Sequence, residues 1–350
     1  MAQRRGSPED RLSELHERLS EAVTALTTGA DWQRAAVFAA KFRSRSFGNS
    51  LLIWVQHQAA FAEGRVPEPE PTFVAGFKQW QQLGRNVLKG QSGHVILAPV
   101  TARFAQLPSG GQPRRLARGE QPRPGEVVRS GMVSGKAVHV WDVSQTDGAP
   151  IPVHPAPVLL SGHAPAGLWA GLAGRVAAAG YTLTDAESAA AIGGANGVTN
   201  FTARTVQVRA DMQDAARVKT LAHELGHVLL HDPQEDAGPP HRGIGEVEAE
   251  TVALMLCATY GLSTEDYSVP YVASWASRVD GVEPADLVRT LGEKVRRTVL
   301  DLLPQLPTPA IGDGEPPGLS RDASTGASDR AAVRPRPERE TGRTSVAVSL

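Results

Sequence analysis

Apolar residues recur at helical spacing through much of the first part of the chain, and short apolar runs follow them. Leucines and valines fall three or four positions apart between residues 7 and 28, after a Ser7-Pro8-Glu9-Asp10 start that suits a helix N-terminus. The expected elements are helices over 7–28, 31–44, 48–62 and 74–83, then strands over 94–100 and 137–143.

The second part of the chain continues this mixture. Helices are expected over 168–179, 215–231, 246–260 and 290–303, with a short alternating strand over 205–209. Apolar residues on several sides of the 215–231 segment predict a mostly buried helix. The pattern as a whole predicts an α+β fold.

Changes in composition divide the chain. A Gly-, Pro-, Arg- and Gln-rich stretch at 105–130 is expected to form a flexible basic loop within a first domain of residues 1–149. A proline-rich linker near 150–157 opens a second domain of residues 150–303. Residues 304–350 have very few large apolar side chains, which predicts a disordered tail.

Charge and cysteine content narrow the classes of function. Residues 1–145 hold 19 Lys and Arg against 12 Asp and Glu, a net of about +7, which favours a polyanionic partner for the first half. There is no apolar run of about 18 residues and no signal-peptide core, so no membrane association or export is expected. The single cysteine, Cys257, fits a reducing, cytoplasmic location.

The buried helix carries His223-Glu224-Leu225-Gly226-His227. Side chains four residues apart lie about 40° apart around a helix, so both imidazoles can bind one ion. Glu224 is placed to act as a general base on metal-bound water, as in zinc peptidases. We therefore expect a Zn²⁺ site with His223 and His227 as ligands and Glu224 as the catalytic residue.

Such a site needs a third protein ligand. Glu246, 19 residues after His227, is the preferred candidate, because it shares a helix face with Glu250, which could support a histidine by hydrogen bonding. Glu248 remains the main rival. His231 is expected to act as a cap or a support rather than a ligand, and His241 is a weaker competitor.

The surroundings of the motif also suggest how a substrate could be held. The strand at 205–209 could pair with an extended peptide by strand addition. Tyr267 and Tyr271 could steady an oxyanion, although packing roles explain them equally well.

Several stretches of the second half resemble the metallopeptidase domain of ArdC-type antirestriction proteins, which is similar to the ImmA/IrrE peptidases. They are GGANGVTNFTARTVQVRAD (193–211), KTLAHELGHVLLH (219–231), EVEAETVALMLCATYGLST (246–264) and DYSVPYVASW (266–275). The resemblance implies a zincin-like α+β domain whose third ligand comes from an acidic E-x-x-A-(D/N/E) segment. Glu246 and Glu250 match its first and last positions.

The first half resembles the ArdC N-terminal domain, regarded as an α+β module that binds single-stranded DNA. The matching text is FGNSLLIWVQHQ (47–58), VAGFKQWQQLGRNVLKGQSGHVILAPV (74–100) and VHVWDVSQTDG (138–148). Cationic and stacking groups suited to single strands are present there. The candidate DNA contacts are Arg43, Arg45, Asn49, Lys78, Trp80, Arg85 and Lys89.

The resemblance implies an antirestriction protein of a mobile genetic element, with single-stranded DNA and a protein substrate of the peptidase domain as partners. Two alternatives stay open. The chain could be an ImmA-like regulatory protease that cuts one repressor, or a DNA-binding protein whose zinc is purely structural.

Overall fold

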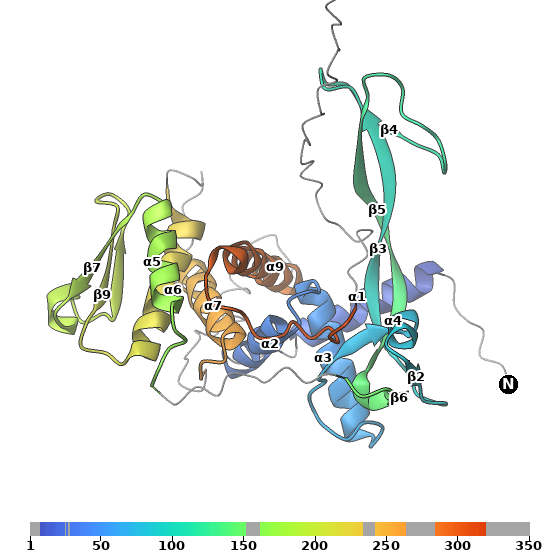
Figure 1. The fold of residues 1–350 in the computed structure, drawn as a ribbon, viewed down its shortest axis with the longest axis horizontal. Coiled ribbons are helices and arrows are strands. Elements are labelled where there is room, and N and C mark those ends of the chain that lie inside the picture. The colour runs from blue at the N-terminus through green and yellow to red at the C-terminus, as the bar shows by residue number, and fades with distance from the viewer. Residues whose placement is uncertain are drawn as a thin grey trace, which may run out of the picture.

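The computed structural model describes residues 8–24, 26, 29–151, 162–233, 242–263 and 284–319. The fold is α+β, as expected, with helices at the centre and two separate groups of strands (Figure 1). Among the described residues, no helix combines the length and the apolar character needed to cross a bilayer.

Three helices open the chain: α1 (Pro8–Thr24), α2 (Gly29–Lys41) and α3 (Phe47–Ala62). The Ser46 hydroxyl accepts a hydrogen bond from the backbone of Asn49 and so satisfies a free N–H at the start of α3. The segment expected as one helix at 74–83 is instead strand β1 (Val74–Gly76) followed by α4 (Phe77–Gln82). Val74 pairs with Asp142 across the sheet, and this pairing overrides the local helical pattern.

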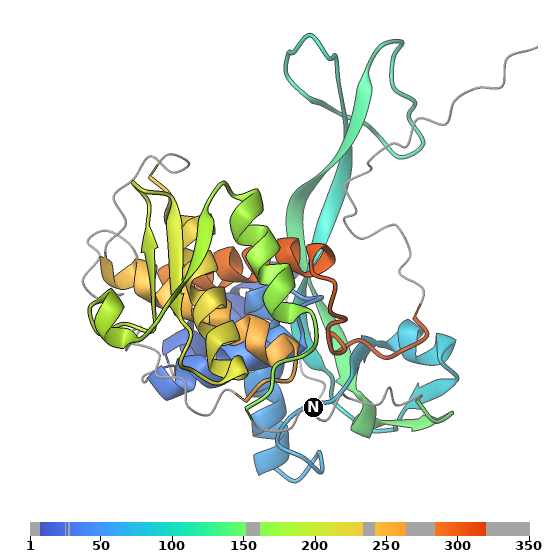
Figure 2. The same ribbon diagram turned by 60° about the vertical axis from the view of Figure 1, so that its left-hand side comes forward.

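A long two-stranded ribbon extends from the body (Figures 1 and 2). Its strands are β3 (His94–Gln106) and β5 (Val127–Asp142), in a sheet of order β1-β5-β3-β4 that includes the short β4 (Arg114–Arg115). The expectation of a loop over 105–130 is therefore partly wrong, because the ladder continues to the pair Gln106 and Val127. Backbone pairing holds these residues, although little of the ribbon is buried.

Helix α3 covers the free edge of β3 at its base. The Asn49 amide both donates to and accepts from the backbone of Leu97, at 2.8 and 2.9 Å. The Gln56 amide does the same for Val95, at 2.9 and 2.8 Å. These residues lie seven positions apart, two turns of one helix face, so α3 supplies the hydrogen bonds that a further strand would make.

The second half builds the other sheet. Its order is β7 (Thr182–Ala186), β9 (Thr205–Arg209) and β8 (Gly197–Asn200), with β9 parallel to β7 and antiparallel to β8. The strand expected at 205–209 is present, but it lies in the middle, where both its edges are already paired. The expectation that it adds a substrate strand is therefore wrong, and β8 has the free edge.

Helices α5 (Leu168–Ala178), α6 (Asp214–His231), α7 (Arg242–Thr259) and α9 (Pro284–Leu302) complete this half. The short strands β2 (Arg85–Val87) and β6 (Thr146–Gly148) pair beside α4. Among the described residues, one cluster of buried apolar side chains includes members of both halves. A hydrogen bond also links the two halves: Trp32 Nε1 of α2 donates to Thr251 Oγ1 of α7 at 2.9 Å.

The expected tail begins later than composition suggested. Residues 303–319 leave α9 and pack back on the body, with Leu306 only 8% exposed. The backbone of Ile311 donates to Thr259, and that of Val74 donates to Gly314. The prediction of a disordered tail is thus wrong for residues 304–319, where backbone hydrogen bonds compensate for the scarcity of apolar residues. Residues 320–350 lie outside the described residues.

Candidate metal centre

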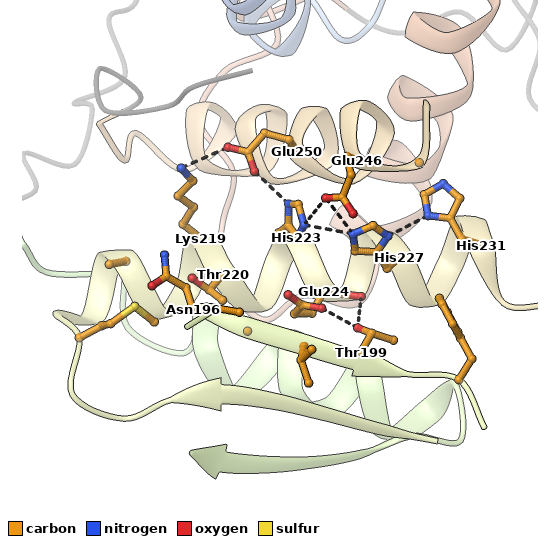
Figure 3. A pocket seen from close by; sticks show the side chains of 17 residues that line it. Asn196, Thr199, Lys219, Thr220, His223, Glu224, His227, His231, Glu246 and Glu250 are labelled. Atoms are coloured by element: carbon orange, nitrogen blue, oxygen red, sulfur yellow. Dashed lines mark hydrogen bonds and ion pairs between the residues drawn. The ribbon is translucent and has the colours of Figure 1, made fainter. Parts of the chain in front are cut away.

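The HELGH motif lies in the middle of α6, which packs against α7. Gly226 allows this contact, because a Cβ there would lie 3.0 Å from the Cα of Ala249. His223 and His227 point from α6 toward α7, and Glu224 points toward strand β8 (Figure 3). Glu246 extends from the first turns of α7 toward both imidazoles.

Three donor atoms converge on one point. The Nε2 atoms of His223 and His227 lie 3.1 Å apart, and a Glu246 oxygen lies 3.6 and 3.7 Å from them. Tetrahedral zinc with bonds of about 2.0–2.1 Å would separate its ligand atoms by about 3.3 Å. The donor set and its spacing therefore fit a divalent metal ion held by His223, His227 and Glu246.

Each histidine is supported from behind. His223 Nδ1 lies 2.9 Å from Glu250, whose other oxygen pairs with Lys219 at 3.2 Å. His227 Nδ1 lies 3.0 Å from His231 Nδ1. These contacts leave both Nε2 atoms directed at the shared point, as metal-binding histidines require.

The rival carboxylate Glu248 has a different role. It is buried against His231 Nε2 at 2.8 Å and Lys294 Nζ of α9 at 2.8 Å. His227, His231, Glu248 and Lys294 therefore form a continuous chain of polar contacts. His231 was expected only as a cap or support. Its signal is the spacing to His227, since residues four apart on a helix are neighbours.

Charge in the site follows from these contacts. Burial lowers the pKa of His223, but contacts with Glu246 and Glu250 outweigh it and raise the pKa to about 9. Hydrogen bonds from His223 and His227 hold the pKa of Glu246 well below its usual range. Burial raises the pKa of Glu224 despite the nearby imidazoles, which gives it the stronger basicity that proton transfer uses.

Strand β8 forms the wall opposite α7. Thr199 Oγ1 donates to Glu224 Oε2 at 2.7 Å and so fixes the carboxylate (Figure 3). Gly197 of the same strand lies so close to α6 that a Cβ would be 2.8 Å from Glu224 Oε1. The motif residues, Glu246 and β8 line an open pocket of about 800 Å³, a size that suits an extended segment or a small ligand.

The sequence alone did not identify Thr199, Lys219 or Lys294. Lys219 was detectable, since it lies one turn before His223, but Thr199 and Lys294 reach the site only through tertiary packing. Of the other candidates, His241, Tyr267 and Tyr271 lie outside the described residues.

Most of the expected DNA contacts are engaged inside the protein. Four polar candidates bond backbone groups, which makes them supports of the fold rather than free ligands for phosphate. Arg43 donates to Ile311 and Gly312, Arg45 to Val74, Arg85 to Thr146 and Ala149, and Asn49 bonds Leu97.

Trp80 is fully buried, and its Nε1 donates to the carbonyl of Trp141 at 3.0 Å. A base cannot reach it, so its expected stacking role is wrong; the pattern of a short helix did not reveal which aromatic faces inward. Lys78 and Lys89 are exposed, as a phosphate contact requires.

Two separate segments of the chain match known protein families. Residues 9–127 match the family described as the N-terminal domain of anti-restriction factor ArdC. Residues 186–265, which contain α6 and α7, match the IrrE N-terminal-like domain of the M78 peptidase family.

Individual relatives are distant. An uncharacterised Bacillus anthracis protein is 23% identical over 275 residues, which are 73% of this chain and 45% of that protein, so the chain spans less than half of its length. Crystal structures of the antirestriction protein ArdC from plasmid R388 were matched in two forms. The metal-free form is 21% identical, covering 74% of this chain and 84% of that one, with a TM-score of 0.46.

The Mn(II)-bound form is 20% identical, covering 74% and 88% of the two chains, with a TM-score of 0.41. These structural likenesses are too low to support conclusions about the site. The chain therefore contains a segment similar to the N-terminal domain of anti-restriction factor ArdC, followed by a segment similar to the IrrE N-terminal-like peptidase domain that contains the candidate metal centre.

Proposed function

We propose that this chain is an antirestriction protein that binds single-stranded DNA through its ArdC-type half and carries a zinc metallopeptidase centre in its peptidase-like half. The observation that carries the proposal is the convergence of His223, His227 and Glu246 beside the buried carboxylate of Glu224. The cofactor is a divalent ion held by this donor set, and the two-histidine, one-carboxylate combination favours zinc.

When bound, the ion would lower the pKa of a water toward about 7 and polarise a peptide carbonyl. Glu224 accepts the proton of that water and returns it to the leaving amine. Thr199 keeps the Glu224 carboxylate oriented through the 2.7 Å hydrogen bond, and burial keeps it basic.

The substrate of this chemistry is an extended polypeptide. Strand β8 lies at the edge of its sheet and lines the pocket, so its unpaired backbone groups can add a substrate strand beside Glu224.

The test compares wild type with Glu224→Gln and His223→Ala. Metal content after purification and reloading with Zn²⁺ or Mn²⁺ is measured first. Wild type and Glu224→Gln should bind one equivalent, with Zn²⁺ held more tightly, and His223→Ala should lose it. Mn²⁺ held as tightly as Zn²⁺ would contradict the choice of zinc.

Cleavage of a peptide library and protection of DNA against restriction are then measured with the same variants. Glu224→Gln should lose cleavage by at least about 100-fold, the scale of a lost general base. Wild type that takes up metal but cleaves nothing, with DNA protection unchanged in Glu224→Gln, would instead identify the ion as structural. Cleavage of one repressor with no DNA affinity would favour a regulatory protease.

A further inference from the structure

Three aromatic rings form a row on the surface at the base of the ribbon. Phe77 of α4 meets Trp141 of β5 with ring centroids 6.1 Å apart, and Trp141 meets His139 at 6.1 Å in a stacked arrangement. Phe77 is 47% exposed, and His139 is exposed as well. We call Phe77, Trp141 and His139 the aromatic row.

The row is held in place rather than loosely attached. Trp141 lies flat against Gly93, where a Cβ would come within 2.7 Å of the indole, and its Nε1 donates to the carbonyl of Gln91 at 3.4 Å. His139 and Trp141 lie two positions apart on one strand and so share a face. A rigid exposed aromatic surface costs little conformational entropy when a ligand stacks on it.

Positive charge lies around the aromatic row. Lys78 follows Phe77 on α4, and Lys89 lies two residues before Gln91. Within the described part of the chain, neither Lys78 nor Lys89 forms an ion pair.

We propose that the aromatic row stacks the unpaired bases of single-stranded DNA, with the phosphates on Lys78 and Lys89. Aromatic faces beside unpaired cations are the combination that single-strand-binding surfaces use, because every base has a face to stack and every linkage a charge. A duplex hides its base faces, and a neutral protein partner would not need the cations. The inference rests on the proposed DNA-binding function and assigns it a surface that the buried Trp80 cannot provide.

The test measures the binding of a fluorescein-labelled oligothymidylate by anisotropy for wild type, Phe77→Ala and His139→Ala. Loss of one stacked base should weaken binding by about ten-fold. Phe61→Ala is the matched control, because Phe61 is 40% exposed on α3, away from the aromatic row, and should bind as wild type does.

An abasic oligonucleotide of equal length separates stacking from charge. Wild type should prefer thymidylate to the abasic strand, and Phe77→Ala should lose that preference while keeping its affinity for the abasic strand. Quenching of tryptophan fluorescence by thymidylate should disappear in Trp141→Phe.

Wild type that binds neither strand would contradict the proposed DNA function itself. If Phe77→Ala and His139→Ala bind thymidylate as tightly as wild type does, the DNA function stands and only the role of the aromatic row is contradicted. Equal weakening in Phe61→Ala would also overturn it, since the effect would then not be local.

Discussion

At the scale of single residues, the imidazole of His227 has both nitrogens engaged. Its Nε2 faces the shared metal point, and its Nδ1 contacts His231, which contacts Glu248. If Glu248 accepts the Nε2 proton of His231, His231 Nδ1 is left as an acceptor for His227 Nδ1–H. That arrangement leaves the Nε2 lone pair of His227 available for the ion.

Changing His231 to Ala, or Glu248 to Gln, should therefore weaken metal affinity by about 10–100-fold without removing a ligand. Competition with a chromophoric chelator measures the affinity. His163→Ala, an exposed histidine that does not line the pocket, is the control and should bind as wild type does. Affinity unchanged in His231→Ala would show that the contact does not orient His227.

A second histidine pair, in the first half, makes stability depend on pH. His57 and His94 are buried with their rings joined at 3.1 Å, and burial lowers the pKa of His94 to about 3. An unfolded histidine titrates near 6.5, so above that pH both states are neutral and the pair has no effect. Below it the unfolded state gains a proton that the folded state does not, and stability falls until about pH 3.

The free energy of unfolding should drop by up to about 1.4 kcal/mol per pH unit for each such histidine within this window. Urea unfolding at about pH 7 and about pH 5 measures it. His94→Gln should show a shallower fall than wild type, since other titrating groups are common to both. An equal slope in the two proteins would contradict this assignment.

The convergence of His223 and His227, the two candidate ligands on α6, could be predicted from the sequence because local spacing places them on one helix face. For the third ligand, the sequence could favour Glu246 but not exclude Glu248. Which of the two faces the histidines depends on how α7 is rotated, and its packing sets that rotation. Most of the DNA candidates, but not Lys78 and Lys89, failed for a different reason. Whether Arg43 or Trp80 faces solvent depends on residues 311–314 and on Trp141, which lie far away in sequence.

At the scale of elements, strands β7 and β8 escaped the sequence pattern because they are short and their alternation is weak. Yet β8 is the strand that borders the site. Its place depends on Gly197, whose missing side chain lets β8 lie against α6. Such close approaches are set by tertiary packing, so local propensity does not reveal them.

Gly197→Ala should therefore destabilise the protein by about 1–3 kcal/mol, the cost of overpacking, and displace Glu224. Thermal unfolding measures the stability. Gly174→Ala in α5 is the matched control, because nothing lies within 4 Å of its Cβ, and it should be neutral or slightly stabilising. Equal melting temperatures for wild type and Gly197→Ala would mean that β8 can move away freely.

At the scale of the whole molecule, the segment after α9 ties distant parts together. Arg43 of the first half donates to Ile311 and Gly312, while Ile311 donates to Thr259 of α7 and Gly314 accepts from Val74. The composition of this segment predicted disorder, because few of its residues are large and apolar. Its order comes from backbone hydrogen bonds, which composition does not report.

Truncation after Leu303 should lower the melting temperature by several degrees, since it removes these bonds and the buried Leu306. Truncation after residue 319 should leave the melting temperature near that of the full chain. Calorimetry of the full chain and of the two truncated proteins measures the three melting temperatures. Equal losses from both truncations would place the stabilising contacts beyond residue 319.

Helix α9 carries two neighbouring residues with separate partners. Glu293 accepts from the backbone of Phe47 at the start of α3, and Lys294 pairs with Glu248 behind the metal site. The two segments that match known families therefore share one buried core, and exchanging either segment alone would disrupt the contacts between them. A chimaera that joins the first segment of this chain to the second segment of a relative should therefore fold only when the contacting surfaces of α2, α3, α7 and α9 are exchanged together.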